Sequence, residues 1–523
     1  MKRPSTALKL ALCIFWLFAI VLPLIRMLST MASVDVLAVM TAKKFIRAFR
    51  QSVTVSTVAT LISVSIAGIL SWCVARTNVK HKGLISTVLT VPMLIPSISH
   101  GMGLIIILGA NGWLSRLLGL NGGIYGFWGI VLGSVMYSFP VAYLMLYDVL
   151  WYEDGTPYEA AEVMGLRGID RLCSITLPYL RKPLISVFFA TFTMIITDYG
   201  VPLMVGGKYT TLPVMMYQDV IGMLDFGKGS VIGMILLTPA LIACFLDIAN
   251  RDKGNSSYVG KAYPVKDNRR RDTAAGGVCL IVIVLILLPI ISFAVLAFMN
   301  KYPIDMTLSL KNVEQAIHMG AGRYMTNSLL IAVVVSITGT ATAVMNAYMT
   351  ARNQTKLSGV LHLMSISSLA IPGLVLGLSY VMFFKKSLIY GTFAMLFLVN
   401  SVHFFASPYL MAYNTFGKIN KNLEAVGSTM GISRWNMVKD VILPQARGTI
   451  LEMISYLFIN SMMTISAVSF LANVNTKPVA LMITQFEGQM QLECAAFVSL
   501  LILVINLVMK GIIHAGKTRV INV

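Results

Sequence analysis

The sequence predicts an all-α membrane protein that crosses the bilayer about twelve times. Of its 523 residues, 57% are hydrophobic and only 12% are charged, a balance that soluble domains do not have. Apolar runs close to twenty residues, the length a helix needs to cross a bilayer, recur along the chain. Short sequence patterns also recur at a nearly constant spacing, which indicates two similar halves.

The predicted spans divide evenly between the two halves. Lys2 and Arg3 precede the first apolar run, which we interpret as a helix and not a signal peptide, because it is long and lacks a small-residue cleavage site. The first-half spans cover residues 7–27, 52–75, 84–109, 127–150, 183–205 and 230–248. The second-half spans cover residues 275–299, 326–350, 358–384, 389–413, 448–471 and 494–509.

The basic residues set the predicted orientation. The formal net charge is +20, and most of the 41 Lys and Arg residues fall on one side if the N-terminus is cytoplasmic. This is the bias expected of cytoplasmic loops, and it places both termini inside. Nucleic-acid binding is not expected, because the basic loops lack interleaved aromatic residues. The exception is the outer segment that contains Lys43, Lys44, Arg47 and Arg50, where we expect a short amphipathic helix on the outer surface.

The repeated patterns define the domain organisation. Ala75-Arg76 and Pro96 recur at one spacing as Ala351-Arg352 and Pro372, and Leu177-Pro178 recurs as Leu443-Pro444. Each half has six predicted spans, an even number, so the two halves face the same way across the membrane. We expect a first half at residues 1–250, a basic cytoplasmic linker at 251–274 and a second half at 275–523.

The most informative polar stretch is the loop Thr156–Pro178. Thr156 is suited to cap a helix, Pro157 to its first position, and Glu159 follows three residues after the cap. Gly165 predicts a bend after this helix, and a second short helix should run to Pro178. A partner loop covers residues 422–444. By the count of spans, both loops lie on the cytoplasmic side.

The first loop resembles the signature loop of binding-protein-dependent ABC importer permeases. Its matching positions are Glu159, Ala160, Ala161, Gly165, Ile175, Leu177 and Pro178. In the second loop Gly431, Leu443 and Pro444 match, Ala425 takes the place of the glutamate, and Glu424 lies one residue early. The whole chain is similar to the fused permeases of the ferric iron, 2-aminoethylphosphonate and thiamine group, in which one polypeptide supplies both membrane halves. The resemblance implies the type I ABC importer permease fold.

The resemblance also implies partners and a mechanism. Each loop would be a coupling helix docked on a cytoplasmic ABC ATPase, two copies of which would bind ATP and Mg²⁺, while an extracytoplasmic binding protein delivers the solute. This chain itself would hold no cofactor and would reside in the bacterial cytoplasmic membrane. The residues expected to contact the ATPases are Glu159, Ala160, Ala161, Gly165, Arg167, Glu424, Gly431 and Arg434.

Other interpretations remain at this point. The loops could be plain surface connectors, and an ion-gradient-driven secondary transporter can also have twelve spans in two parallel halves. The paired loops argue against such a carrier, which has no use for an ATPase-docking helix. Residues 511–518 satisfy a phosphate-loop pattern, but they follow a membrane span instead of a strand, so we expect no ATP binding and no catalytic residues in this chain.

Four residues within or at the ends of spans are candidates for the translocation path: Asp198, Tyr199, His100 and His403. Charged groups are costly in a bilayer and often functional there, and Asp198 could attract a cationic solute. It could equally be hydrogen bonded to neighbouring spans. The six cysteines and 33 methionines show no ligand spacing, so no metal site is expected. The stretch Tyr199–Phe226 resembles the iron and phosphonate permeases most.

Overall fold

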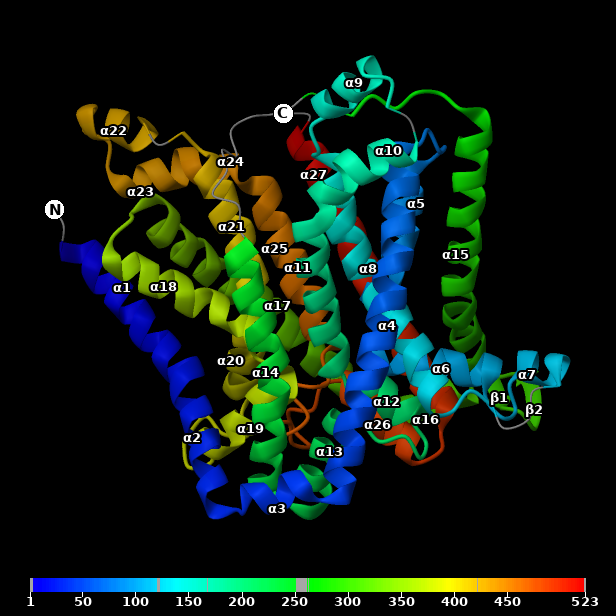
Figure 1. Cartoon of the computed structure of the whole chain (residues 1–523). Coiled ribbons are helices and arrows are strands. Elements are labelled where there is room, and N and C mark those ends of the chain that lie inside the picture. The colour runs from blue at the N-terminus through cyan, green and yellow to red at the C-terminus, as the bar shows by residue number, and fades with distance from the viewer. Residues whose placement is uncertain are drawn as a thin grey trace.

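A computed structural model describes residues 3–119, 123–166, 168–250, 261, 263–420 and 422–521. Long helices run between two opposite ends of the molecule (Figure 1). One end carries the short helices α9 (Thr156–Val163) and α22 (Asn422–Thr429), and we refer to it as the α9/α22 end. The other carries α3 (Val36–Thr41) and α26 (Ala480–Gly488), and is the α3/α26 end.

The elements of the first half follow in chain order. They are α1 (Arg3–Trp16), η1 (Leu17–Val21), α2 (Leu22–Thr30), η2 (Met31–Ser33), α3, α4 (Lys43–Arg76), α5 (Lys82–Leu89), η3 (Val91–Leu94), α6 (Ser97–Leu108), α7 (Trp113–Leu118), α8 (Phe127–Trp151), α9, α10 (Ile169–Arg171), η4 (Leu172–Thr176), α11 (Leu177–Ile196), α12 (Gly200–Val205), α13 (Leu212–Tyr217), η5 (Gln218–Gly222) and α14 (Phe226–Asn250).

The second half has the same general order, with one added hairpin. Its elements are α15 (Arg269–Leu296), β1 (Met299–Lys301), β2 (Asp305–Leu308), α16 (Lys311–His318), α17 (Ala321–Ala347), η6 (Tyr348–Arg352), α18 (Lys356–Ser367), η7 (Ser368–Ala370), α19 (Gly373–Phe384), α20 (Phe393–His403), α21 (Ala406–Lys418), α22, α23 (Arg434–Met437), η8 (Val438–Ile442), α24 (Leu443–Gln445), α25 (Arg447–Met463), α26 and α27 (Leu492–Ile521). The strands β1 and β2 form an antiparallel pair.

The prediction of a polytopic all-helical membrane protein is confirmed. Within the described ranges, nine helices are long and apolar enough to cross a membrane, and two bent helix pairs raise the number to eleven. The predicted span 448–471 corresponds to α25, a helix of only 17 residues. The phosphate-loop pattern at 511–518 lies within α27, so its backbone is helical and does not form the loop that such a site requires.

Two predicted spans, 84–109 and 358–384, are broken at equivalent prolines. Ile95 and Ile371 have extended backbone conformations, and α6 and α19 start directly after Pro96 and Pro372. The residue before a proline is disfavoured in helical conformation, which explains both breaks. In the second half, the chain direction bends by 110° between the two helical parts.

Two other spans end earlier than the sequence predicts. The helix α11 ends at Ile196 instead of residue 205, and α12 starts separately at Gly200 with Pro202 in its first turn. The Asp198 carboxylate accepts the Val201 N–H at 3.0 Å and the Gly200 N–H at 3.3 Å, two N–H groups of that first turn. The helix α25 ends at Met463, before residue 471, where Thr464 becomes extended. The basic residues 43–50 of the predicted outer amphipathic helix form the first turns of the long helix α4 instead. The separate short helix of this outer segment is α3, directly before them.

The duplication extends to individual hydrogen bonds. The Ser52 hydroxyl accepts the backbone N–H of Leu212 at 2.7 Å, and Ser328, its counterpart, accepts that of Val479 at 2.8 Å. The π-helical turns η4 and η8 also occupy equivalent positions, each directly before a Leu-Pro pair. The two halves therefore repeat in structure as well as in sequence.

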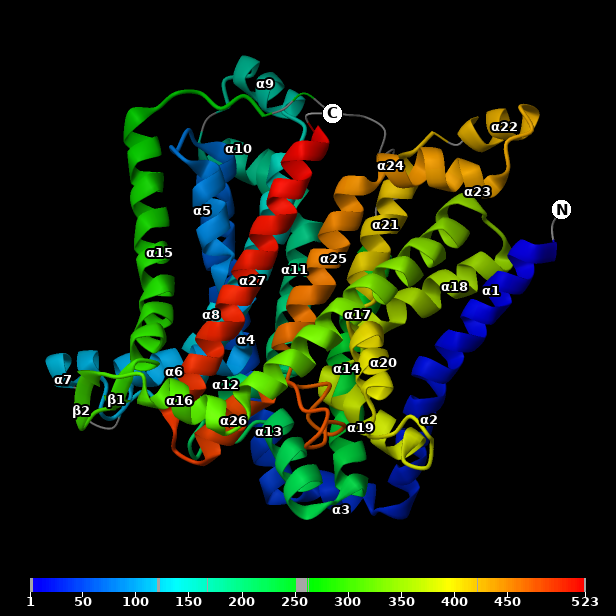
Figure 2. The same ribbon diagram turned by 180° about the vertical axis from the view of Figure 1, so that it is seen from behind.

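The first helix of each half packs against the opposite half. The helices α1 and α2 lie against α18 and α19, whereas α15 lies against α4, α5 and α6 (Figures 1 and 2). The buried Lys9 fixes one of these contacts, because its ammonium donates to Asn353 O at 2.5 Å and to Ser358 Oγ at 2.8 Å. The exchange of first helices interlocks the halves.

The contact between α6 and α15 depends on Gly103. A Cβ added there would lie 2.7 Å from the Pro289 carbonyl oxygen and 2.9 Å from the Pro289 Cβ. We predict that Gly103→Leu separates the two helices and costs about 1–3 kcal/mol of stability by overpacking. The thermal unfolding temperature of the purified protein should fall. Gly277→Leu on α15 is the control, since nothing lies within 4 Å of its added Cβ; equal unfolding temperatures for the two variants would contradict this packing.

Candidate functional site

The two predicted coupling loops lie at the same end of the molecule. Both α9 and α22 project beyond the ends of the long helices (Figures 1 and 2). Each is followed by a glycine with positive φ, +76° at Gly165 and +71° at Gly431. Such a conformation is strained for residues with a Cβ, so the predicted glycine bend is present in both loops.

Each bend is closed by the same pair of backbone hydrogen bonds. One bond spans five residues and the other spans three, the pattern that ends many helices at a left-handed glycine. The four bonds are Leu166 N to Ala161 O at 2.9 Å, Gly165 N to Glu162 O at 3.0 Å, Ile432 N to Gly427 O at 2.8 Å and Gly431 N to Ser428 O at 3.3 Å. The two loops therefore have closely similar backbones, although their sequences differ.

The start of α9 differs by one residue from the prediction. Gly155, and not Thr156, is the N-cap residue, and Thr156 is already helical. The Asp154 carboxylate accepts both the backbone N–H of Thr156, at 3.0 Å, and its hydroxyl, at 2.8 Å. These hydrogen bonds stabilise the charged form and lower the pKa of Asp154 below its ordinary value.

A buried ion pair anchors the first loop. Arg76, at the end of α4, pairs with Glu153, which follows α8, and both side chains are buried. The Tyr158 hydroxyl donates to Glu153 Oε1 at 2.8 Å and lies 2.7 Å from the Thr176 hydroxyl. Removing one partner of a buried pair costs about 3–5 kcal/mol. The loop is thus held rigidly against α4, α8 and the start of α11.

The second loop is anchored by the equivalent arginine with a different partner. Arg352 binds the Glu424 carboxylate with two nitrogens, one of them at 2.6 Å, and its side chain is buried. Its other hydrogen bonds go to backbone carbonyls, at 2.5 Å to Ile419, 2.9 Å to Asn420 and 3.2 Å to Phe416. Glu424 therefore turns toward its own half, not outward.

The remaining predicted coupling residues take different positions. Glu159 is half-exposed and forms an ion pair with Lys261 at 2.7 Å. Ala160 is exposed, whereas Ala161 is buried beneath α9. Arg434, the first residue of α23, is exposed. Arg167 lies outside the described residues.

Both loops expose apolar side chains that sequence reasoning missed. Met164 and Met430 precede the two glycines and are 69% and 70% exposed. Ile169 and Trp435 lie four residues after the glycines and are 76% and 70% exposed. Exposed apolar groups in matching positions indicate a binding surface. The repeated Met-Gly pair was the available sequence signal.

The candidate path residues Asp198 and Tyr199 lie where the two halves meet. Ser97, the first residue of α6, donates to Asp198 Oδ1 at 2.6 Å. The Tyr199 hydroxyl is 2.7 Å from the hydroxyl of Ser469 in the second half, and its ring stacks on Tyr217 at 4.9 Å. Asp198 is only partly buried. These side chains line the contact between the α11–α12 break and the segment after α25.

The two histidines lie near this contact. His100 is one turn after Ser97 and donates through Nε2 to the Pro92 carbonyl at 3.2 Å. His403 ends α20, and its Nε2 would be 3.1 Å from a Cβ added at Gly373, the first residue of α19. Each histidine has a buried Nδ1 without a hydrogen-bond partner. Among the described residues, no group of three or more His, Cys, Asp or Glu side chains is placed to hold a metal ion.

Comparisons with known proteins give the family. The family model described as "Binding-protein-dependent transport system inner membrane component" matches the chain twice, at residues 59–250 and 347–521. The two matched segments contain the first and second loops respectively.

Relatives named as ferric and thiamine transport permeases align with this chain over different lengths. The putative ferric transport system permease protein FbpB 1 of Haemophilus influenzae is 26% identical over 473 residues, 86% of this chain and 74% of the relative. The ferric transport system permease protein FbpB of Actinobacillus pleuropneumoniae is 24% identical over 434 residues, 78% of this chain and 62% of the relative. The thiamine transport system permease protein ThiP of H. influenzae is 27% identical over 164 residues, 29% of this chain and 30% of that protein.

The family model covers well over half of the chain, and the fold has the expected duplicated helical architecture. The chain belongs to the family of inner-membrane components of binding-protein-dependent transport systems, and it is a multi-pass ABC permease that carries the family's domain twice in one polypeptide.

Proposed function

We propose that this chain is the permease subunit of an ATP-driven importer for ferric iron. In this proposal a separate extracytoplasmic binding protein delivers the solute, and two copies of a cytoplasmic ATPase drive transport. The observation that carries the proposal is the pair of loops with matching backbones, which expose Met164 and Met430 in equivalent positions at one end of the molecule. Two such surfaces on one chain suit two copies of one partner.

The proposed orientation places the α9/α22 end in the cytoplasm. The helix α27 ends on this side, and α1 begins nearer to this end than to the α3/α26 end (Figures 1 and 2). The proposed binding protein would dock at the α3/α26 end. ATP and Mg²⁺ would be bound by the partner ATPases, because the phosphate-loop pattern of this chain is part of α27.

The connection from each loop to the path is direct. The turn η4 continues into α11, which ends two residues before Asp198. The turn η8 leads through α24 into α25, which ends at Met463, one residue before Thr464, the counterpart of Asp198. A helix of 20 residues such as α11 spans about 30 Å. Arg76 and Arg352 each fix one loop to the helices of its own half. Displacement of a loop by an ATPase would therefore also move the segments around Asp198.

Ferric iron is the proposed solute for two reasons. The relatives that align with most of this chain are named ferric transport permeases. The described groups at the meeting of the halves include the Asp198 carboxylate and the Tyr199 phenol, and hard cations favour oxygen ligands. Of the two solutes that the sequence favours, the relatives support ferric iron over an aminoethylphosphonate.

The docking surface is tested with charged substitutions of its exposed methionines. We predict that Met164→Asp combined with Met430→Asp weakens binding of the copurifying ATPase by at least about tenfold, because a carboxylate would be buried in an apolar contact. The affinity is measured with purified protein in nanodiscs. Met490→Asp is the matched control, since Met490 is 88% exposed and follows α26 at the other end. Unchanged affinity in the double variant would exclude these loops as the docking site.

The path is tested at Asp198. We predict that Asp198→Asn reduces ATP-dependent ⁵⁵Fe uptake into proteoliposomes by about tenfold or more, because the carboxylate charge that attracts the cation is lost. ATPase binding should be unchanged. Asp35→Asn is the control, because Asp35 also caps a helix, accepting the Ala38 N–H at 3.0 Å. Full uptake by Asp198→Asn would remove Asp198 from the path.

A further inference from the structure

The chain between the two halves lies against the first loop. We call Lys261 and residues 263–268 the linker strand, although they form neither a helix nor a β-strand. The backbone N–H of Gly155, the N-cap residue of α9, donates to the Lys261 carbonyl at 2.6 Å. The Lys261 ammonium lies 2.7 Å from Glu159 Oε1, and Lys266 forms an ion pair with Glu162. The Lys266 contact lowers the pKa of Glu162. Both exposed carboxylates of α9 are therefore paired with the linker strand.

An aromatic contact joins the linker strand to the buried anchor of this loop. The Tyr263 ring packs edge-to-face on Tyr158, with centroids 4.8 Å apart. The Arg76 guanidinium lies 3.8 Å from the Tyr263 centroid, close enough for a cation–π interaction. Tyr263 thus covers the ion pair between Arg76 and Glu153 and adds to the network that fixes α9.

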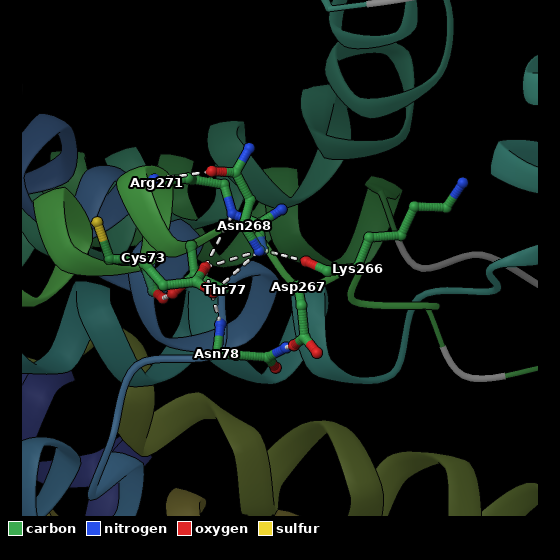
Figure 3. Close-up of polar contacts among 8 residues, drawn as sticks. Cys73, Thr77, Asn78, Lys266, Asp267, Asn268 and Arg271 are labelled. Carbon is green, nitrogen blue, oxygen red and sulfur yellow. Dashed lines mark hydrogen bonds and ion pairs between the residues drawn. The ribbon is translucent and has the colours of Figure 1, made fainter.

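The other end of the linker strand is attached where α4 ends and α15 begins (Figure 3). The Asn78 side chain donates to Asp267, and the Asn78 backbone N–H donates to Asp272 Oδ1 at 3.2 Å. Arg271 in α15 donates to the Lys266 carbonyl at 2.5 Å. The strand therefore connects α9 of the first half with the first helix of the second half.

The linker strand also shares the exposed face of α9. The Lys261 and Lys266 side chains are 67% and 66% exposed, and the strand runs beside α9 at the outermost level of this end (Figure 1). A partner that covers the exposed Val163 and Met164 would meet these lysines. A lysine ammonium has three N–H donors, so each keeps donors for a partner carboxylate after pairing with α9.

We propose that the linker strand and α9 form one composite docking surface for the first ATPase subunit, in which Lys261 and Lys266 bind carboxylates of that subunit. This inference rests on the proposed function. It makes the two docking surfaces unequal, because the glutamate of the second loop is turned toward Arg352. It also gives the first ATPase a contact with the chain that leads directly into α15.

The test separates the two docking surfaces with the methionine variants. In full-length chain carrying Met430→Asp, the remaining ATPase binds at the first loop; in chain carrying Met164→Asp, it binds at the second. Native mass spectrometry of nanodiscs with the copurifying ATPase then measures each affinity. Adding Lys261→Glu and Lys266→Glu should weaken binding roughly tenfold in the first background and leave it unchanged in the second.

Two further variants keep the test clear of folding effects. Lys261→Gln with Lys266→Gln removes the charges without creating repulsion, and should weaken first-loop binding by about threefold. Lys80→Glu changes an exposed lysine between α4 and α5, outside the linker strand and α9, and should have no effect. Equal affinity in the first background with and without the lysine changes would overturn the proposal, as would equal weakening in both backgrounds. Failure of the unmodified chain to bind any ATPase would instead refute the proposed function.

Discussion

Two buried arginines, Arg76 and Arg352, stabilise the α9/α22 end of this molecule. Each lies at the end of the second long helix of its half, and each is paired with a carboxylate, Glu153 or Glu424. A buried guanidinium without a partner is strongly destabilising, so these pairs fix the backbone around them. The loops that carry the exposed methionines are consequently fixed to the helices of the bundle. In the proposed function, an ATPase that displaces a loop would also displace the helices attached to it.

The duplicated halves use this common scaffold in different ways. The glycine bends, their hydrogen bonds and the turns η4 and η8 are repeated. The carboxylates are not: Glu153 lies before α9, whereas Glu424 lies within α22. The first loop is thereby left with Glu159 and Glu162 for the linker strand. At the position where the first half carries Asp198, the second half carries Thr464.

Much of the fold could be predicted because the bilayer imposes simple rules on the sequence. Apolar runs gave most of the spans, and the repeated patterns gave the duplication and the equivalence of the loops. The bends after α9 and α22 could be predicted from Gly165 and Gly431, because a positive φ favours glycine. Pro96 and Pro372 were sequence signals of the two helix breaks, but the prediction treated both spans as unbroken helices.

Features that depend on distant contacts could not be predicted. The position of the Asp198 carboxylate depends on Ser97, a residue about a hundred positions earlier. The inward turn of Glu424 depends on Arg352. The packing of α1 and α15 on the opposite halves leaves no mark in the apolar pattern, because both faces of these helices meet apolar surroundings. Exposure of Met164 and Met430 is likewise a property of the folded loops.

In the proposed function, one chain offers two docking loops to two copies of an ATPase. The most direct measurement is the mass of the complex isolated through a tag on this chain and analysed by native mass spectrometry. We expect one permease chain with two copies of the same ATPase. A complex with a single ATPase copy at saturating concentration, or a chain that binds none, would contradict it.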